Sequence, residues 1–140
     1  MSYQESAKSV AMQFLTAYAS RNTDACMSLM AKNSPLLIVG TNADEVFTMP
    51  DEVRHSLKRD FDNMSNVMLG EANYVAVIAE ETLASVLLEL PISFLANDQQ
   101  ENLHLRYAFS LVKEHGEWRI AQAMASVPVS SGSYNFSSWG

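Results

Sequence analysis

The stretch that decides the fold of this chain is residues 101–129, ENLHLRYAFSLVKEHGEWRIAQAMASVPV. Apolar residues recur along both halves of this stretch, on either side of a polar turn from Glu114 to Glu117 that contains Gly116. A period of two is typical of a β-strand with one buried face, and a short polar turn with glycine joins antiparallel strands. The stretch therefore predicts a long β-hairpin. We expect the rest of the chain to build a curved wall and a helical lid around it.

The alternation also assigns the side chains of the hairpin to two faces. On the first strand, Tyr107 and Phe109 share one face, and we expect their bulky rings to line or fill the interior. On the return strand, one face carries Ala121, Ala123 and Ala125, and the other carries Gln122, Met124 and Ser126.

Length and charge limit the possible functions of the chain. With 140 residues, 48% of them apolar, we expect one domain with a hydrophobic core. The formal net charge is −7, which repels phosphate backbones and anionic membrane surfaces. We therefore expect neither nucleic acid nor a membrane as a partner.

Cysteine and histidine usage argues against metal and disulfide chemistry. Cys26 is the only cysteine, so the chain cannot form an internal disulfide, and a reducing cytoplasm is the expected location. His55, His104 and His115 are scattered and have no metal-ligand spacing. The sequence also lacks a glycine-rich phosphate loop and a serine-nucleophile motif, and we expect neither a signal peptide nor a membrane span. We expect no metal and no cofactor.

Changes in periodicity upstream of the hairpin predict helices followed by strands. Val10, Phe14 and Tyr18 recur every four residues, which is typical of an amphipathic helix. The expected helices span about residues 3–20, 23–30 and 50–64, and the expected strands span about residues 36–39, 46–48, 67–69, 74–78 and 82–95. Pro91 lies inside the last of these strands and has no N–H for the ladder. We therefore expect a bulge or a sheet edge there, which would help the sheet to curve.

The C-terminal residues differ in character from the rest of the chain. We divide the chain into a single domain, residues 1–128, and a tail, residues 129–140, in which serine and glycine predominate. That composition is typical of a loose tail. Tyr134, Phe136 and Trp139 favour instead a tail that docks on the body or on a second subunit.

This order of elements and three short motifs resemble a SnoaL-like domain of the nuclear transport factor two-like superfamily. The motifs are Gly40-Thr41 followed by Asp44-Glu45, Lys58-Arg59-Asp60-Phe61, and Gly116-Glu117-Trp118-Arg119-Ile120 leading to Ser126-Val127-Pro128. The resemblance spans roughly residues 5–128. It implies an α+β fold, in which a strongly curved mixed or antiparallel sheet wraps around three N-terminal helices and forms a cone with an internal pocket.

What the resemblance implies for function is broader, because the superfamily contains isomerases, cyclases, dehydratases, kinase association domains and transport adaptors. In the isomerases, a tyrosine on the first helix and an aspartate after the second helix do the chemistry. The matching neighbourhoods here are Phe14 and the apolar run 36–39. Members of this subgroup often carry histidines on the last strand, where this chain has Gln122 and Met124. An aliphatic side chain cannot act as a general base.

The resemblance also suggests where the chain binds other molecules. The superfamily's dimers commonly pack through the outer sheet face, so we expect Gln122, Met124 and Ser126 to form a homodimer interface. The residues that we expect to line a ligand pocket are Phe14, Tyr18, Phe61, Tyr107, Phe109, Ala123 and Ala125.

Two carboxylates are candidate catalytic groups. Glu89 lies in an apolar strand, where burial would raise its pKa, and Asp60 precedes the apolar anchor Phe61. Each has a plainer alternative: Glu89 could face solvent or a partner subunit, and Asp60 could pair with a basic neighbour or cap a loop.

Three functional hypotheses follow from the sequence. The first is a homodimeric domain that binds a small apolar organic ligand. The second is an isomerase, cyclase or dehydratase that uses Glu89 or Asp60 with Tyr18. The third is an adaptor that binds only proteins.

Overall fold

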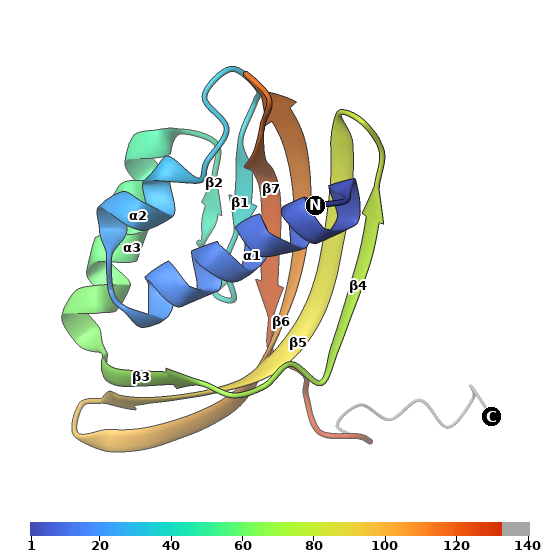
Figure 1. Ribbon diagram of the computed structural model, residues 1–140. Coiled ribbons are helices and arrows are strands. Elements are labelled where there is room, and N and C mark those ends of the chain that lie inside the picture. The colour runs from blue at the N-terminus through green and yellow to red at the C-terminus, as the bar shows by residue number, and fades with distance from the viewer. Residues whose placement is uncertain (133–140) are drawn as a thin grey trace.

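The computed structural model describes residues 1–132 and has three helices on one side of a curved, open sheet (Figure 1). The helices are α1 (Tyr3–Ala19), α2 (Thr23–Ser28) and α3 (Pro50–Asn63). The strands are β1 (Leu37–Val39), β2 (Val46–Phe47), β3 (Ser65–Leu69), β4 (Tyr74–Ala79), β5 (Leu83–Ala96), β6 (Gln99–Glu114) and β7 (Glu117–Ser126). These elements confirm the predicted α+β class and the predicted helices and strands, with shifts of one or two residues at their ends.

The seven strands form one mixed sheet. The strand order is β2-β1-β7-β6-β5-β3, and β4 pairs with β5 beside β3. The strands β4 to β7 pair antiparallel with one another in chain order, whereas β1 runs parallel to β7. In Figure 1, α1 crosses the concave face of the sheet, with α2 and α3 beside it. The sheet thus curves around the helices.

The hairpin of β6 and β7 forms as predicted. Glu114 and Glu117 are paired at its end, so the connection is the two residues His115 and Gly116, with φ angles of 53° and 79°. Positive φ at both central positions is the requirement of the type I′ turn, whose twist matches the flanking strands. The return strand ends at Ser126, three residues before the end of the stretch quoted above.

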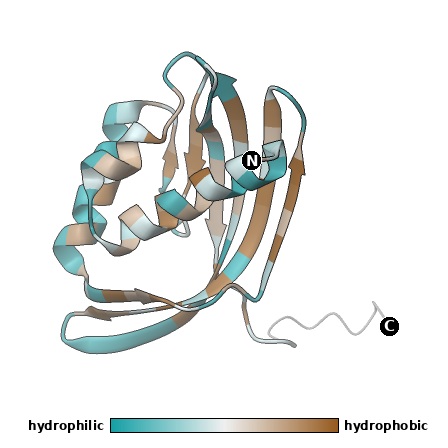
Figure 2. Ribbon diagram, in the orientation of Figure 1, coloured by the Kyte–Doolittle hydropathy of each residue, from teal (hydrophilic) through white to brown (hydrophobic). Residues whose placement is uncertain are grey.

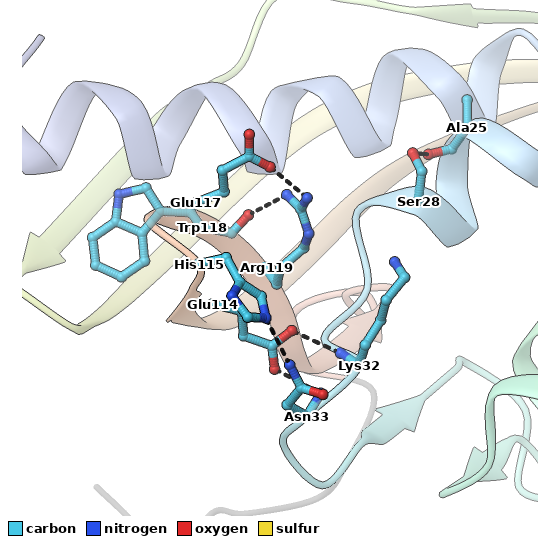
Figure 3. Close-up of polar contacts among 9 residues, drawn as sticks. All are labelled: Ala25, Ser28, Lys32, Asn33, Glu114, His115, Glu117, Trp118 and Arg119. Carbon is cyan, nitrogen blue, oxygen red and sulfur yellow. Dashed lines mark hydrogen bonds and ion pairs between the residues drawn. The ribbon is translucent and has the colours of Figure 1, made fainter.

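Glu114 ties this hairpin to the loop after α2 (Figure 3). Its carboxylate accepts hydrogen bonds from the backbone N–H groups of Lys32 (2.8 Å) and Asn33 (2.9 Å) and from the hydroxyl of Ser34 (3.1 Å). These donors hold the pKa of Glu114 below its ordinary value. This one carboxylate therefore links the loop at residues 32–34 to the end of β6.

Pro91 lies where the neighbour of β5 changes. The register with β6 continues through it without a shift, because Pro91 pairs with His104. Its carbonyl accepts from the N–H of Gly70, so its backbone faces the gap between β3 and β4. The missing N–H therefore disrupts no ladder bond. Of the two expected alternatives, a bulge is absent at Pro91, and the position is instead a local edge, where the pairing of β5 changes from β3 to β4.

The hydrophobic core lies between the helices and the concave face of the sheet. Figure 2 shows hydrophobic residues along β4 and β5 and hydrophilic residues at the turn between β5 and β6. Cys26 is fully buried, which is typical of a free cysteine that packs as a small apolar side chain. None of the helices within residues 1–132 is both long and apolar enough to span a membrane. The predicted docking of Tyr134, Phe136 and Trp139 lies outside the described residues.

Candidate functional site

A cavity of about 320 Å³ lies between the concave face of the sheet and the helices α1 and α3. Its position agrees with the pocket that the fold resemblance implies. The side chains that line it include Phe14, Tyr18, Met30, Ile38, Phe47, Val53, Leu57, Asp60, Ile92, Phe94, Leu103, Leu105, Tyr107, Phe109, Ala123, Ala125 and Val127. Most of them are apolar, so the cavity offers a ligand mainly hydrophobic contact.

Packed aromatic rings form one wall of the cavity. Tyr107 and Phe109 lie two residues apart on the inner face of β6, and their rings stack with centroids 4.9 Å apart. Phe14 meets both rings edge to face, at 6.0 and 5.9 Å. Edge-to-face and stacked contacts fix the orientation of such rings. On the neighbouring strand β7, Ala125 and Ala123 pair with Tyr107 and Phe109 and leave space because their side chains are small.

The polar end of the cavity is built from α1 and α3. The Tyr18 hydroxyl donates a hydrogen bond of 2.9 Å to Oδ2 of Asp60. Burial raises the pKa of Asp60, and the bond from Tyr18 opposes that rise in part. Burial and the neighbouring carboxylate together raise the pKa of Tyr18. A carboxyl group and a phenol hydroxyl are among the groups that act as general acids and bases, and both line the cavity here.

Glu45 is a second carboxylate at the cavity wall, and the sequence analysis did not predict it as a site residue. Its side chain is only 8% exposed, accepts from the N–H of Asn42 (2.8 Å) and lies 3.5 Å from the guanidinium of Arg59. A Cβ at Gly40 would approach the Glu45 side chain to 2.9 Å. The glycine therefore makes room for the carboxylate. Gly40 and Glu45 both belong to the first sequence motif, Gly40-Thr41 followed by Asp44-Glu45. That motif was the signal in the sequence that could have pointed to Glu45.

The structure brings most of the predicted pocket residues together. Of the seven, six line the cavity: Phe14, Tyr18, Tyr107, Phe109, Ala123 and Ala125. Phe61 does not, because it packs behind Tyr18, with ring centroids 5.2 Å apart. Asp60, one of the two catalytic candidates, also lines the cavity.

Glu89 lies on the opposite face of the sheet, so the expected pairing with Tyr18 does not occur. Its carboxylate bonds to Nε of Arg106 (2.7 Å) and to the side-chain amide of Asn73 (2.7 Å), and Nδ1 of His104 lies 3.9 Å away. Arg106, then Asn73, hold the pKa of Glu89 below its ordinary value. This carboxylate stays ionised outside the cavity, and we set aside its role as a pocket base.

The outer face of the sheet exposes a row of apolar side chains. Gln122, Met124 and Ser126 all lie on this face and are exposed, as the alternation predicts. Met124 is 54% exposed. Strand pairing places it in a row that crosses five strands: Ala76, Leu87, Ala108, Met124 and Val39. Within residues 1–132, no group of three or more His, Cys, Asp or Glu side chains is arranged to hold a metal ion.

Solved structures of similar fold come from several bacteria. A candidate dehydratase of the nuclear transport factor two-like family from Streptomyces avermitilis is 14% identical, with a TM-score of 0.79 over 90% of this chain and 97% of that one. A ketosteroid isomerase-like protein from Erwinia carotovora atroseptica is 15% identical, with a TM-score of 0.76 over 91% and 97%. An uncharacterised protein with a cystatin-like fold from Caulobacter vibrioides is 11% identical, with a TM-score of 0.74 over 98% and 97%.

At these identities the likeness shows the fold alone, and no curated protein matches the sequence. The SnoaL-like domain family matches residues 7–130, nearly the whole chain. With the α+β cone described above, this match shows that the chain belongs to the SnoaL-like domain family.

Proposed function

We propose that this chain binds a small organic molecule with a largely apolar body in the cavity between α1, α3 and the sheet. The observation that carries the proposal is the cavity itself, with one aromatic wall and one polar end at Tyr18 and Asp60. Its volume of about 320 Å³ lies at the lower end of the range for small-molecule sites, roughly 300–1,000 Å³. The apolar wall favours binding by burial, and the polar end orients the ligand.

A neutral fluorescent probe, N-phenyl-1-naphthylamine, tests this proposal. We expect saturable binding, and we expect Ala125→Leu to weaken it at least about tenfold because the added side chain occupies the cavity. Thr82→Leu places the same side chain at an exposed position of the turn before β5, away from the cavity and from the outer face of the sheet, and should leave binding unchanged. Thermal unfolding of both variants verifies that they fold. Equal binding by wild type and the Ala125 variant would contradict the proposal.

We further propose that two copies of the chain associate through the outer face of the sheet. Leu87 is 49% exposed, Met124 54% and Ile78 72%, and large exposed apolar patches are typical of protein interfaces. A two-fold interface uses the same patch on both copies, so this one face would supply both sides of the contact. Light scattering on a sizing column should give a dimer. Leu87→Asp should give a monomer, whereas Met49→Asp, at an exposed site before α3, should not.

The hydrogen bond between Tyr18 and Asp60 favours a second candidate, an enzyme of the isomerase, cyclase or dehydratase type. Asp60 would take a proton from a carbon next to a carbonyl, and Tyr18 would donate a hydrogen bond to the oxygen that gains charge. NMR in D₂O would measure exchange of such protons in 4-phenyl-2-butanone. Enzyme-dependent exchange that Asp60→Asn abolishes and Asp62→Asn retains would support catalysis. Exchange that survives in the Asp60 variant would rule out this role.

A further inference from the structure

We propose that the molecule bound in this cavity carries a positive charge, as an amine or a quaternary ammonium group attached to an apolar body. This inference rests on the proposed binding function and names the chemical class of the ligand. It follows from three properties of the cavity: the sign of its charged side chains, the aromatic rings of its walls and the free oxygen of Asp60.

The charged side chains that line the cavity are both acidic. Among the described lining residues they are Asp60 and Glu45, and no lysine, arginine or histidine joins them. Arg59 lies 3.5 Å from Glu45, but its half-exposed side chain is not among those that line the cavity. An anionic ligand would therefore meet two like charges and no partner. A cation would meet attraction that the low polarity of the cavity strengthens.

The aromatic rings favour the same charge. Six lining residues carry such rings: Phe14, Tyr18, Phe47, Phe94, Tyr107 and Phe109. The faces of these rings are electron-rich, so they attract an ammonium group while they also bury the apolar body attached to it. Aromatic walls with a carboxylate at one end are a common arrangement for binding organic cations.

Asp60 has bonding capacity left for a ligand. Within residues 1–132 the hydrogen bond from Tyr18 to Oδ2 is the only one that Asp60 makes, so Oδ1 is available to an N–H donor. Glu45, by contrast, is occupied by Asn42 and Arg59. An ammonium group at Asp60 would form a charge-assisted hydrogen bond, which is about twice as strong as a neutral one. A neutral alcohol would form only the weaker bond.

Protonation of Asp60 should make the binding of a cation depend on pH. The titratable and charged groups that face Asp60 are Tyr18 on α1, Tyr107 on β6, Glu45 in the loop before β2 and Arg59 on its own helix. Burial raises the pKa of Asp60, with a contribution from Glu45, and a bound cation would lower it again. Binding of a cation should therefore strengthen as the pH rises through this pKa, and should release a proton below it.

Three probes with one apolar body test the charge preference: 3-phenylpropylamine, 3-phenyl-1-propanol and 3-phenylpropanoate. Calorimetry at pH 7.5 and physiological salt should show the amine binding about tenfold or more tightly than the alcohol, with no saturable binding of the carboxylate. Asp60→Asn should reduce the preference to about twofold, mainly by weakening the binding of the amine. Asp62→Asn removes the same charge from an exposed position of α3 and should leave the preference intact.

Each alternative outcome has a distinct reading. Equal binding of amine and alcohol, or tighter binding of the carboxylate, would overturn the charge inference and leave the cavity as a binding site. If none of the three probes binds, both the proposed function and this inference fail. Benzyltrimethylammonium, which does not titrate, completes the test. Its affinity should increase with pH in the wild type and stay constant in the Asp60→Asn variant, and a constant affinity in both proteins would overturn the inference.

Discussion

Replacing Tyr18 with phenylalanine isolates the interaction that controls the charge of Asp60. The two groups meet at 2.9 Å, and the hydroxyl favours the ionised form of the carboxyl by donating to it. Burial acts in the opposite direction and is the larger effect, so the pKa of Asp60 lies above its ordinary value. Without the hydroxyl, burial and Glu45 still raise the pKa and only Arg59 opposes them, so the pKa should rise further.

The size of this rise follows from the strength of one hydrogen bond to a charged group, about 1.5–3 kcal/mol. Asp60 is only half-buried, so solvent screens the interaction and the lower end of that range applies. One pKa unit corresponds to about 1.4 kcal/mol, so we expect Tyr18→Phe to raise the pKa of Asp60 by about one unit.

Carbon-detected NMR of the aspartate carboxyl groups measures this directly. The Asp60 signal is assigned by its loss in Asp60→Asn, and the signal of the exposed Asp62 serves as an internal reference. An Asp60 pKa in Tyr18→Phe that equals or falls below the wild-type value would refute our account of the polar end.

The same pKa has a consequence for stability, with a definite sign. A carboxyl whose folded pKa is raised binds more protons in the folded state than in the unfolded state. Its contribution to stability is complete below its unfolded pKa, about 3.8, and is lost as the pH rises through the folded value. This loss should be larger in Tyr18→Phe and absent in Asp60→Asn, as urea unfolding at several pH values would measure.

Three further outcomes concern the body of the fold. Leu88→Ala, at a fully buried position of β5, should lower the free energy of unfolding by about 2–5 kcal/mol in urea titrations. Glu114→Ala should destabilise the protein near neutral pH, and the difference from wild type should shrink as the pH falls through the lowered pKa of Glu114, whereas Glu117→Ala should show neither effect. Cys26, which is buried and whose pKa burial raises to about 12, should resist thiol reagents until the protein unfolds.

The elements of this fold could be predicted from the sequence because they depend on local periodicity. The four-residue spacing of Phe14 and Tyr18 and the alternation along β6 and β7 each assign side chains to one face of one element. Six of the seven expected pocket residues therefore line the cavity. Phe61 does not, because its place behind the Tyr18 ring depends on how α1 and α3 pack together, which no local pattern records.

Glu89 shows why the polar residues were harder to place. The strand reads Val86-Leu87-Leu88-Glu89-Leu90, so apolar residues occupy both faces and alternation does not reveal which face is inside. Leu88 is fully buried, whereas Leu87 is 49% exposed on the face that carries Glu89. Apolar residues on the outer face of the sheet obscure the alternation along this strand. The same apolar outer face supports our proposal of a dimer. Tyr18 and Asp60, by contrast, are 42 positions apart, and their contact depends on tertiary packing.

The bend in β7 depends on its pairing with β6, and yet it is visible in the sequence of the strand. Trp118 and Ile120 are buried at even positions, whereas Ala121, Ala123 and Ala125 are buried at odd positions. A regular strand cannot bury both sets on one face, because its side chains alternate. The pairing with β6 slips by one residue there: Ser110 pairs with Gln122, but Leu111 pairs with Ile120, which leaves Ala121 as the extra residue of a β-bulge. The bulge bends the strand and turns the small alanines inward, opposite Phe14. The buried positions thus shift from even to odd numbers between Ile120 and Ala121. This shift marks the point along β7 beyond which its inner side chains, Ala123 and Ala125, line the cavity.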